Sequence, residues 1–169
     1  MSSTVPRAVK AREVLDWCRY GHQKMRSDPT GLEWVLTWAG TIALLRAVGH
    51  ALLKEDDARV KKAQHSWLNT LKATEPKPSI FFDFIKHDRD MLLKERFELT
   101  VVHDVTFTPP PATLSLSGGT IPAPPPTPPI YTYKMKSGRY AGRDPRDLVR
   151  EAIEWWEKQL DDIEQKAAN

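Results

Sequence analysis

The sequence contains a single cysteine among its 169 residues, which excludes an internal disulfide framework. Cys18 lies beside Val14 and Leu15 on one predicted helical face, and a free thiol in such a position suits a reducing compartment. The first twenty residues contain no continuous apolar run, so no secretory signal is expected. These absences together predict a cytoplasmic protein.

The sequence also lacks the motifs of the common metal sites and hydrolases. Its five histidines are scattered, and neither an H-x-x-x-H spacing nor a cysteine pair is present to hold a metal ion. No glycine-rich phosphate loop and no G-x-S-x-G turn occur. The sequence therefore predicts no metal and no cofactor, and it favours a protein that is not an enzyme.

No apolar run is long enough to span a bilayer, but the segment from Thr30 to Lys54 is apolar over most of a helical circumference. Glu33, Arg46 and His50 interrupt it, and Thr30 with Glu33 has the spacing of a capping box. Its apolar positions at helical spacing are Leu32, Val35, Leu36, Ala39, Ile42, Ala43, Val48, Ala51 and Leu52. Such a helix is normally surrounded by other helices, so this segment is predicted to be the core helix of a soluble bundle without membrane contact.

Four further helices are predicted, which makes the fold class mainly α, a five-helix bundle. One covers about Arg7–Met25, one starts at the acidic turn 55–57 and ends before residue 74, and one covers about Ser79–Arg96. The last covers about Asp144–Lys166, because an acceptor cap is followed by proline at the first helical position.

A proline-rich β arm is predicted between the fourth and fifth helices. Leu99, Val101 and His103 alternate with their neighbours, 130–135 alternates again, and 112–117 is predicted to be another short strand before a Gly-Gly turn. Six prolines in the eight residues 122–129 predict a stiff connector, with a PxxP ligand as the alternative.

The predicted domain organisation is a single domain, 1–169, in three parts. Residues 1–96 form a four-helix core, 97–143 form the β- and proline-rich arm, and 144–168 form a C-terminal helix that packs back on the core.

One carboxylate falls inside an apolar stripe. Asp88 lies among the aromatic and aliphatic positions of the fourth helix, where a charge needs a partner. The predicted partner is Arg46 or His50 of the central helix, as a buried polar pair that fixes the helix register rather than as a catalytic acid.

The net charge of +3 says little, but its distribution is uneven. Between residues 131 and 150 only two acids accompany six cations, and the segment before residue 30 is also rich in cations. The six cations are Lys134, Lys136, Arg139, Arg143, Arg146 and Arg150. This basic strip could bind a nucleic acid; a merely solvated face is the alternative.

The segment Ile85–Arg96 resembles the fourth-helix signature of HEPN-type helical proteins, in which R-N/D-x-x-x-H occurs. Arg89 matches the arginine and Asp90 its polar neighbour, whereas Lys94 stands at the histidine position. The resemblance implies a small helical bundle of the kind that acts as a ribonuclease, or as an inactive RNA-binding or partner module, in bacterial and prophage defence and toxin–antitoxin systems.

Three functions follow from these patterns. The first is a non-enzymatic helical module that binds a protein partner, a second copy of itself or nucleic acid, because a lysine pKa of about 10.4 makes Lys94 a poor base. The second is a HEPN-like ribonuclease centred on Arg89, with Lys94 or His87 as its catalytic partner. The third is a structural subunit that assembles through its β arm.

Overall fold

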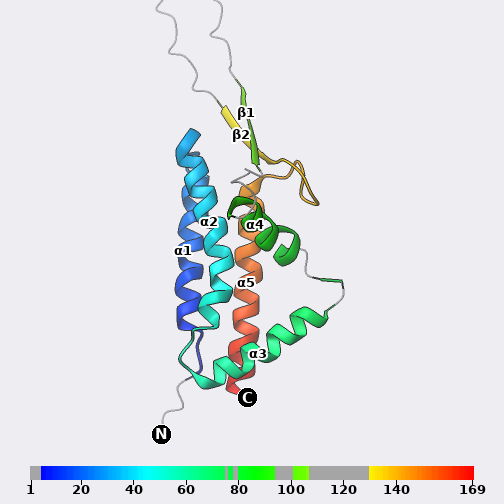
Figure 1. Ribbon diagram of the computed structural model, residues 1–169. Coiled ribbons are helices and arrows are strands. Elements are labelled where there is room, and N and C mark those ends of the chain that lie inside the picture. Colours follow the sequence, from blue (N-terminus) through cyan, green and yellow to red (C-terminus); the bar gives the residue numbers. More distant parts are fainter. Residues whose placement is uncertain (1–4, 75, 78–79, 94–100, 107–129) are drawn as a thin grey trace, which may run out of the picture.

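The computed structural model describes residues 5–74, 76–77, 80–93, 101–106 and 130–169 (Figure 1). The helices are α1 (Val9–Arg26), α2 (Gly31–Leu52), α3 (Ala58–Ala73), the π-helical η1 (Ile80–Lys86), α4 (His87–Leu93) and α5 (Pro145–Ala168). The strands are β1 (Val101–Thr106) and β2 (Ile130–Met135). The prediction of a mainly helical chain with a β-hairpin between the fourth and fifth helices is confirmed.

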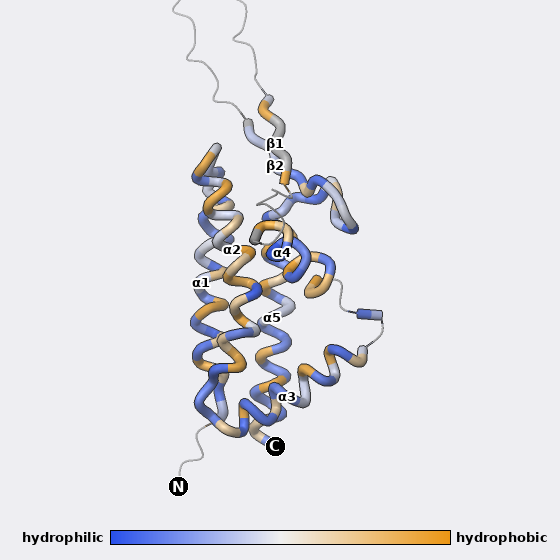
Figure 2. Tube along the Cα trace, viewed as in Figure 1, coloured by the Kyte–Doolittle hydropathy of each residue, from blue (hydrophilic) through white to orange (hydrophobic). Residues whose placement is uncertain are grey.

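Three long helices, α1, α2 and α5, run side by side, and the others pack across them (Figure 1). α3 packs on α5, whereas η1 and α4 pack on α2 and η1 also contacts α5. Trp38 and Ile42 of α2 lie in the shared core with Phe84 and Trp156, as the apolar pattern of the central helix predicts. The hydropathy of the chain follows this arrangement, with α2 the most apolar of the long helices (Figure 2).

α1 and α2 approach each other closely at one point. A Cβ atom on Gly21 would lie 2.3 Å from Oγ1 of Thr41, so glycine is required there. The Thr41 hydroxyl also donates a hydrogen bond to the carbonyl oxygen of Thr37 at 2.7 Å, which fixes the side chain that fills this space.

The first N–H groups of α1 are capped by carboxylates from distant parts of the chain. The N–H of Ala8 donates to Glu164 of α5 at 2.8 Å, and the N–H of Ala11 donates to the buried Glu55 at 2.8 Å. Free N–H groups at a helix start need such acceptors. α1 has no acid in its own first turn, so both caps depend on the tertiary fold.

The prediction that α2 is surrounded by other helices is wrong. Leu32 and Leu36, expected in the core, are 72% and 61% exposed. The neighbouring helices α1, α5, η1 and α4 cover the side of α2 that carries the buried residues Trp34, Trp38 and Ile42, and leave the opposite side bare. The Thr30 side chain also makes no capping hydrogen bond, which contradicts the predicted capping box.

By length and composition α2 would be able to cross a membrane, although that profile is weak evidence. Its 22 residues reach a mean hydropathy of 1.4 over the best window, and only 33% of that window is buried. The core helix of a soluble protein passes the same test, so the fold is compatible with a soluble protein. The low burial adds that much of this apolar helix lies at the surface.

The fourth predicted helix is not one regular α-helix. It begins as the π-helical η1, continues as α4, and its expected end at 94–96 lies outside the described residues. The rings of this segment pack in two directions: Phe81 against Trp156 at 5.9 Å, and Phe84 against Trp38 at 6.1 Å. We attribute the wider turn to this divided packing, which a regular α-turn would not accommodate as readily.

The base of the β arm is fixed to the start of α2. β1 and β2 pair antiparallel, from Val101 opposite Met135 to Thr106 opposite Ile130. Tyr133 stacks on Trp34 with ring centroids 3.6 Å apart, and its hydroxyl donates to the carbonyl oxygen of Pro29 at 2.9 Å. The expected strand 112–117, its Gly-Gly turn and the proline run lie outside the described residues.

Candidate functional site

The bare side of α2 forms an apolar surface, which we call the outer face of α2. Its members recur every three or four residues and therefore lie on one side of the helix. They are Leu32, Leu36, Gly40, Ala43 and Ala47. No charged residue occurs in α2 between Glu33 and Arg46, so the middle of the face is uncharged. Two aromatic residues of α1, Trp17 and Tyr20, are also exposed.

A second feature of this side is a cleft of about 310 Å³ between the C-terminal half of α2, α3 and η1, which we call the cationic cleft. Its apolar wall includes Trp67, Leu68, Leu71, Phe81 and Phe82. Its polar groups are Arg46, His50, Lys72, Lys86 and Gln64. A volume of this size falls at the lower end of the range of small-molecule pockets.

The wall of the cationic cleft is held by hydrogen bonds and ring contacts. Nε1 of Trp67 donates to Oε1 of Gln159 at 2.8 Å, and its ring lies 5.9 Å from that of Trp156. Nε1 of Trp156 in turn donates to the carbonyl oxygen of Leu45 at 2.9 Å. Because each indole N–H is bonded, the rings have fixed orientations and the cleft is preformed.

Arg46 lines the cationic cleft, and the charges of Arg89 and Asp90 on α4 act on it electrostatically. Nη1 of Arg89 lies 2.8 Å from Oδ1 of Asp90, and the ammonium group of Lys86 lies 3.9 Å from the same carboxylate. Burial and the charge of Arg89 lower the pKa of Arg46, while Asp90 opposes this shift. Burial and both arginines lower the pKa of His50, so its imidazole is neutral at pH 7.

Asp88 is buried as predicted, but the expected pair with Arg46 or His50 is not formed. Its carboxylate lies 3.1 Å from Nδ1 of His87, and its other oxygen is buried without a hydrogen-bond partner in the described structure. Burial raises the pKa of Asp88 to about 6, against the opposing effect of His87. Asp88 instead lines a hollow with His87 and Tyr140.

The three catalytic candidates do not form one group. Arg89 lies near Arg46 on the side of the cationic cleft, whereas His87 lines the hollow beside Tyr140. Lys94 lies outside the described residues. The charge of Arg89 acts instead on His50, which the sequence analysis named only as a partner for Asp88.

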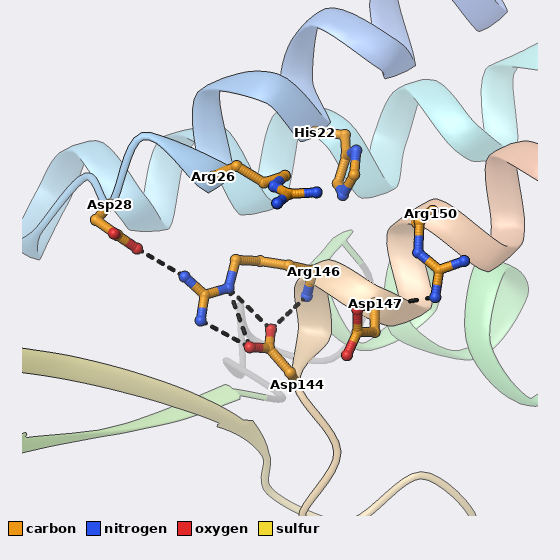
Figure 3. Close-up of a pocket in the computed structure, with 7 residues that line it drawn as sticks. All are labelled: His22, Arg26, Asp28, Asp144, Arg146, Asp147 and Arg150. Atoms are coloured by element: carbon orange, nitrogen blue, oxygen red, sulfur yellow. Dashed lines mark hydrogen bonds and ion pairs between the residues drawn. The ribbon is translucent and has the colours of Figure 1, made fainter.

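The basic strip was predicted from cations in two segments that are far apart in the sequence. The end of α1 and the start of α5, which carry some of these cations, face each other across a hollow of about 350 Å³ (Figure 3). His22 and Arg26 of α1 face the start of α5 there, with Arg146 and Arg150. Three aspartates line the same hollow: Asp28, Asp144 and Asp147. Burial and Arg26 lower the pKa of His22, so three arginines face three aspartates and the hollow carries no net charge at pH 7.

Four cations of the predicted strip have carboxylate partners within the chain. Arg146 binds Asp144 and Asp28, both at 2.7 Å. The other three pairs are Arg139 with Asp83, Arg143 with Glu151, and Arg150 with Glu154. Lys134 and Lys136 are exposed and also make contacts. This pairing leaves the strip with less free positive charge than its composition indicates.

In the part of the chain that the structure describes, no three histidine, cysteine or acidic side chains converge as metal ligands. No family model, curated protein or solved structure matches the chain. The resemblance of Arg89 and Asp90 to the HEPN signature therefore stays a prediction.

Proposed function

We propose that the protein is a cytoplasmic, non-enzymatic helical module that binds a protein partner through the outer face of α2. The observation that carries this proposal is the exposure of Leu32 and Leu36 on a helix face with an uncharged middle. Contiguous apolar surface of this kind marks interaction sites in soluble proteins. A partner helix with an apolar face is the occupant that fits a helical surface best.

A second copy of the chain is the first partner to test, because the outer face is self-complementary. Two α2 helices packed antiparallel about a two-fold axis near Gly40 would place Leu32 opposite Ala47 and Leu36 opposite Ala43. Large side chains would then meet small ones, which is how helices pack closely.

Sedimentation velocity over a range of concentrations tests this proposal with two variants of the outer face. Leu36→Glu places a charge in the interface, and Gly40→Leu adds bulk where a Cβ meets nothing within 4 Å, so neither should disturb the fold. We expect a dimer for the unmodified chain and monomers for both variants.

Val105→Glu on the exposed part of β1 is the matched control, and it should leave the dimer intact. Loss of the dimer in this variant alone would favour assembly through the β arm. If the unmodified chain is monomeric throughout, self-association is excluded. In that case proximity labelling should recover a partner protein with the unmodified chain that is lost with Gly40→Leu. Identical sets of labelled proteins would refute a protein partner at this face.

A ribonuclease is the second candidate, and one observation favours it. His50 lines the cationic cleft with Arg46, and burial with the charges of Arg46 and Arg89 lowers its pKa, so a neutral base and two cations act in one region. Incubation of purified protein with mixed RNA tests it, with Arg89→Ala and His50→Ala beside the unmodified chain. Equal RNA degradation by all three proteins would eliminate this candidate.

Nucleic-acid binding without cleavage would depend on the basic strip. Because four of its cations are paired within the chain, we expect retention on a nucleic-acid column only at low salt. Elution at the same salt concentration after Lys134→Ala and Lys136→Ala would remove the strip from consideration.

A further inference from the structure

The cationic cleft has polar groups that the fold itself does not satisfy. Arg46 forms no ion pair with any described carboxylate, and its Nε atom is buried without a hydrogen bond. Its guanidinium group instead lies over the ring of Phe81, 5.6 Å from the ring centroid. A half-buried cation that is not ion-paired is costly, and an incoming anion would offset that cost.

The charge around the cleft has one sign. Arg46, Lys72 and Lys86 line it, and none of the described lining residues is acidic. Asp90 is close to Arg89 and Lys86 but does not line the cleft, so it leaves an excess of positive charge at the edge. A cleft with low-dielectric walls and one sign of charge concentrates ligands of the opposite sign.

Gln64 provides a second, independent sign of a ligand. Its side chain is 97% buried on the wall of the cleft, yet it makes no hydrogen bond to any residue that the structure describes. The neighbouring residues of the α3 stripe, Val60, Ala63 and Trp67, are all apolar. Its amide is therefore open to the cleft, with donors and an acceptor available to a ligand there.

We propose that the cationic cleft binds a small organic carboxylate with an aromatic body. The ring would lie against Trp67, Phe81 and Phe82, and the carboxylate would accept hydrogen bonds from Arg46 and Lys86. A polar atom on the ring would pair with Gln64. The proposal concerns a different surface from the outer face of α2, so either can fail without the other.

Isothermal titration calorimetry with indole-3-propanoate tests the site, because this probe combines an aromatic ring, an N–H group and a carboxylate. Indole-3-propanamide is the matched neutral ligand. We expect binding of the carboxylate and affinity for the amide that is lower by about tenfold, the loss of one charge-assisted hydrogen bond. The variant Arg46→Met keeps the apolar stem and should also lower carboxylate affinity by about tenfold or more.

Two further variants complete the test. Leu68→Trp fills the cleft and should abolish binding, whereas Lys62→Met removes an exposed cation of α3 outside the cleft and should leave affinity unchanged. Circular dichroism establishes that each variant is folded, and Lys86→Met replaces Arg46→Met if the latter is not. Absence of binding at millimolar ligand, equal affinity for acid and amide, or full affinity in Leu68→Trp would overturn the proposal.

Discussion

The two sides of the bundle differ in how far their polar groups are paired within the chain. Where α1 meets α5, Arg12 binds Asp161 and Glu164, and Arg19 binds Glu157. These pairs join helices from opposite ends of the sequence, and the N–H of Ala8 shares Glu164 with Arg12. We call this the closed side, because each of these charges has its partner within the chain.

The open side consists of the outer face of α2 and the cationic cleft. There Leu36 is exposed, Arg46 has no described anionic partner and Gln64 has no described hydrogen bond. This difference indicates where to look for function. Polar groups that have partners within the chain stabilise the fold, whereas polar groups without such partners, and exposed apolar side chains, are available to another molecule. Mutations on the two sides should therefore differ in both sign and size.

The largest expected effect is on the closed side. Arg12→Met removes the cation that binds Glu164, and the Glu164 side chain is only 16% exposed. Loss of one partner of a buried pair costs about 3–5 kcal/mol; because Arg12 is one-fifth exposed, we expect a loss near the lower limit, about 3 kcal/mol. Urea unfolding monitored by tryptophan fluorescence measures it.

Arg150→Met is the matched control, because Arg150 pairs with Glu154 at 2.9 Å at the surface. An exposed pair contributes much less than a buried one, because solvent screens its charges. If both substitutions cost the same, the closed side owes its stability to packing rather than to matched charges.

The second prediction concerns the buried carboxylate of Asp88, of which only one oxygen has a hydrogen-bond partner in the described structure. Burial raises the pKa of Asp88 from 3.8 to about 6, so between these values the unfolded chain is ionised while the folded protein still holds the proton. Unfolding then releases a proton, and stability falls as pH rises from about 4 to 6. Asp88→Asn removes this charge and should stabilise the protein by about 2–3 kcal/mol at pH 7.

The pH dependence distinguishes this explanation from a packing effect. At pH 4 Asp88 is protonated in the folded protein, so the substitution should change stability little. Guanidinium unfolding at both pH values compares the two proteins. A gain of the same size at pH 4 would indicate a packing effect, and a loss at pH 7 would show that the Asp88–His87 contact stabilises the ionised form.

Two glycines compare the packed and bare sides of the α1–α2 pair directly. Gly21→Ala would bring a methyl group to 2.3 Å from Oγ1 of Thr41 and should cost about 1–3 kcal/mol through overpacking. Gly40→Ala meets nothing within 4 Å and should stabilise α2 by up to about 1 kcal/mol. Thermal unfolding measures both, and a loss with Gly40→Ala would mean that the outer face is covered even in the isolated protein.

The sequence predicted the helices and the hairpin because their signals are local. Asp144 and Pro145 mark the start of α5, and the side chain of Asp144 accepts the N–H of Arg146 at 2.8 Å. The alternating segment 130–135 is β2. Such caps and periods depend on neighbouring residues alone, so they can be identified before the fold is known.

The candidate site was predicted only in part, because it depends on which helices meet. The apolar pattern of α2 shows that the helix is apolar, but not that α1, α5, η1 and α4 all pack on one side of it. Asp88 was expected to bind Arg46 or His50, yet its carboxylate lies beside the adjacent His87. Gln64, a polar residue within the α3 stripe, was the one local signal of the cationic cleft.

The smallest expected effect is on the open side, at Arg46. Burial and Arg89 lower its pKa, so the folded protein disfavours this charge, and its stem already packs on Phe81. Arg46→Met retains an apolar stem of similar length and removes the guanidinium group, which has no ion-pair partner among the described residues. We therefore expect the free energy of unfolding to increase by less than about 1 kcal/mol. Measured beside Arg12→Met in urea, the two arginines should differ by severalfold. A loss as large as that of Arg12→Met would show that Arg46 has a stabilising partner, and the distinction between the two sides would no longer hold.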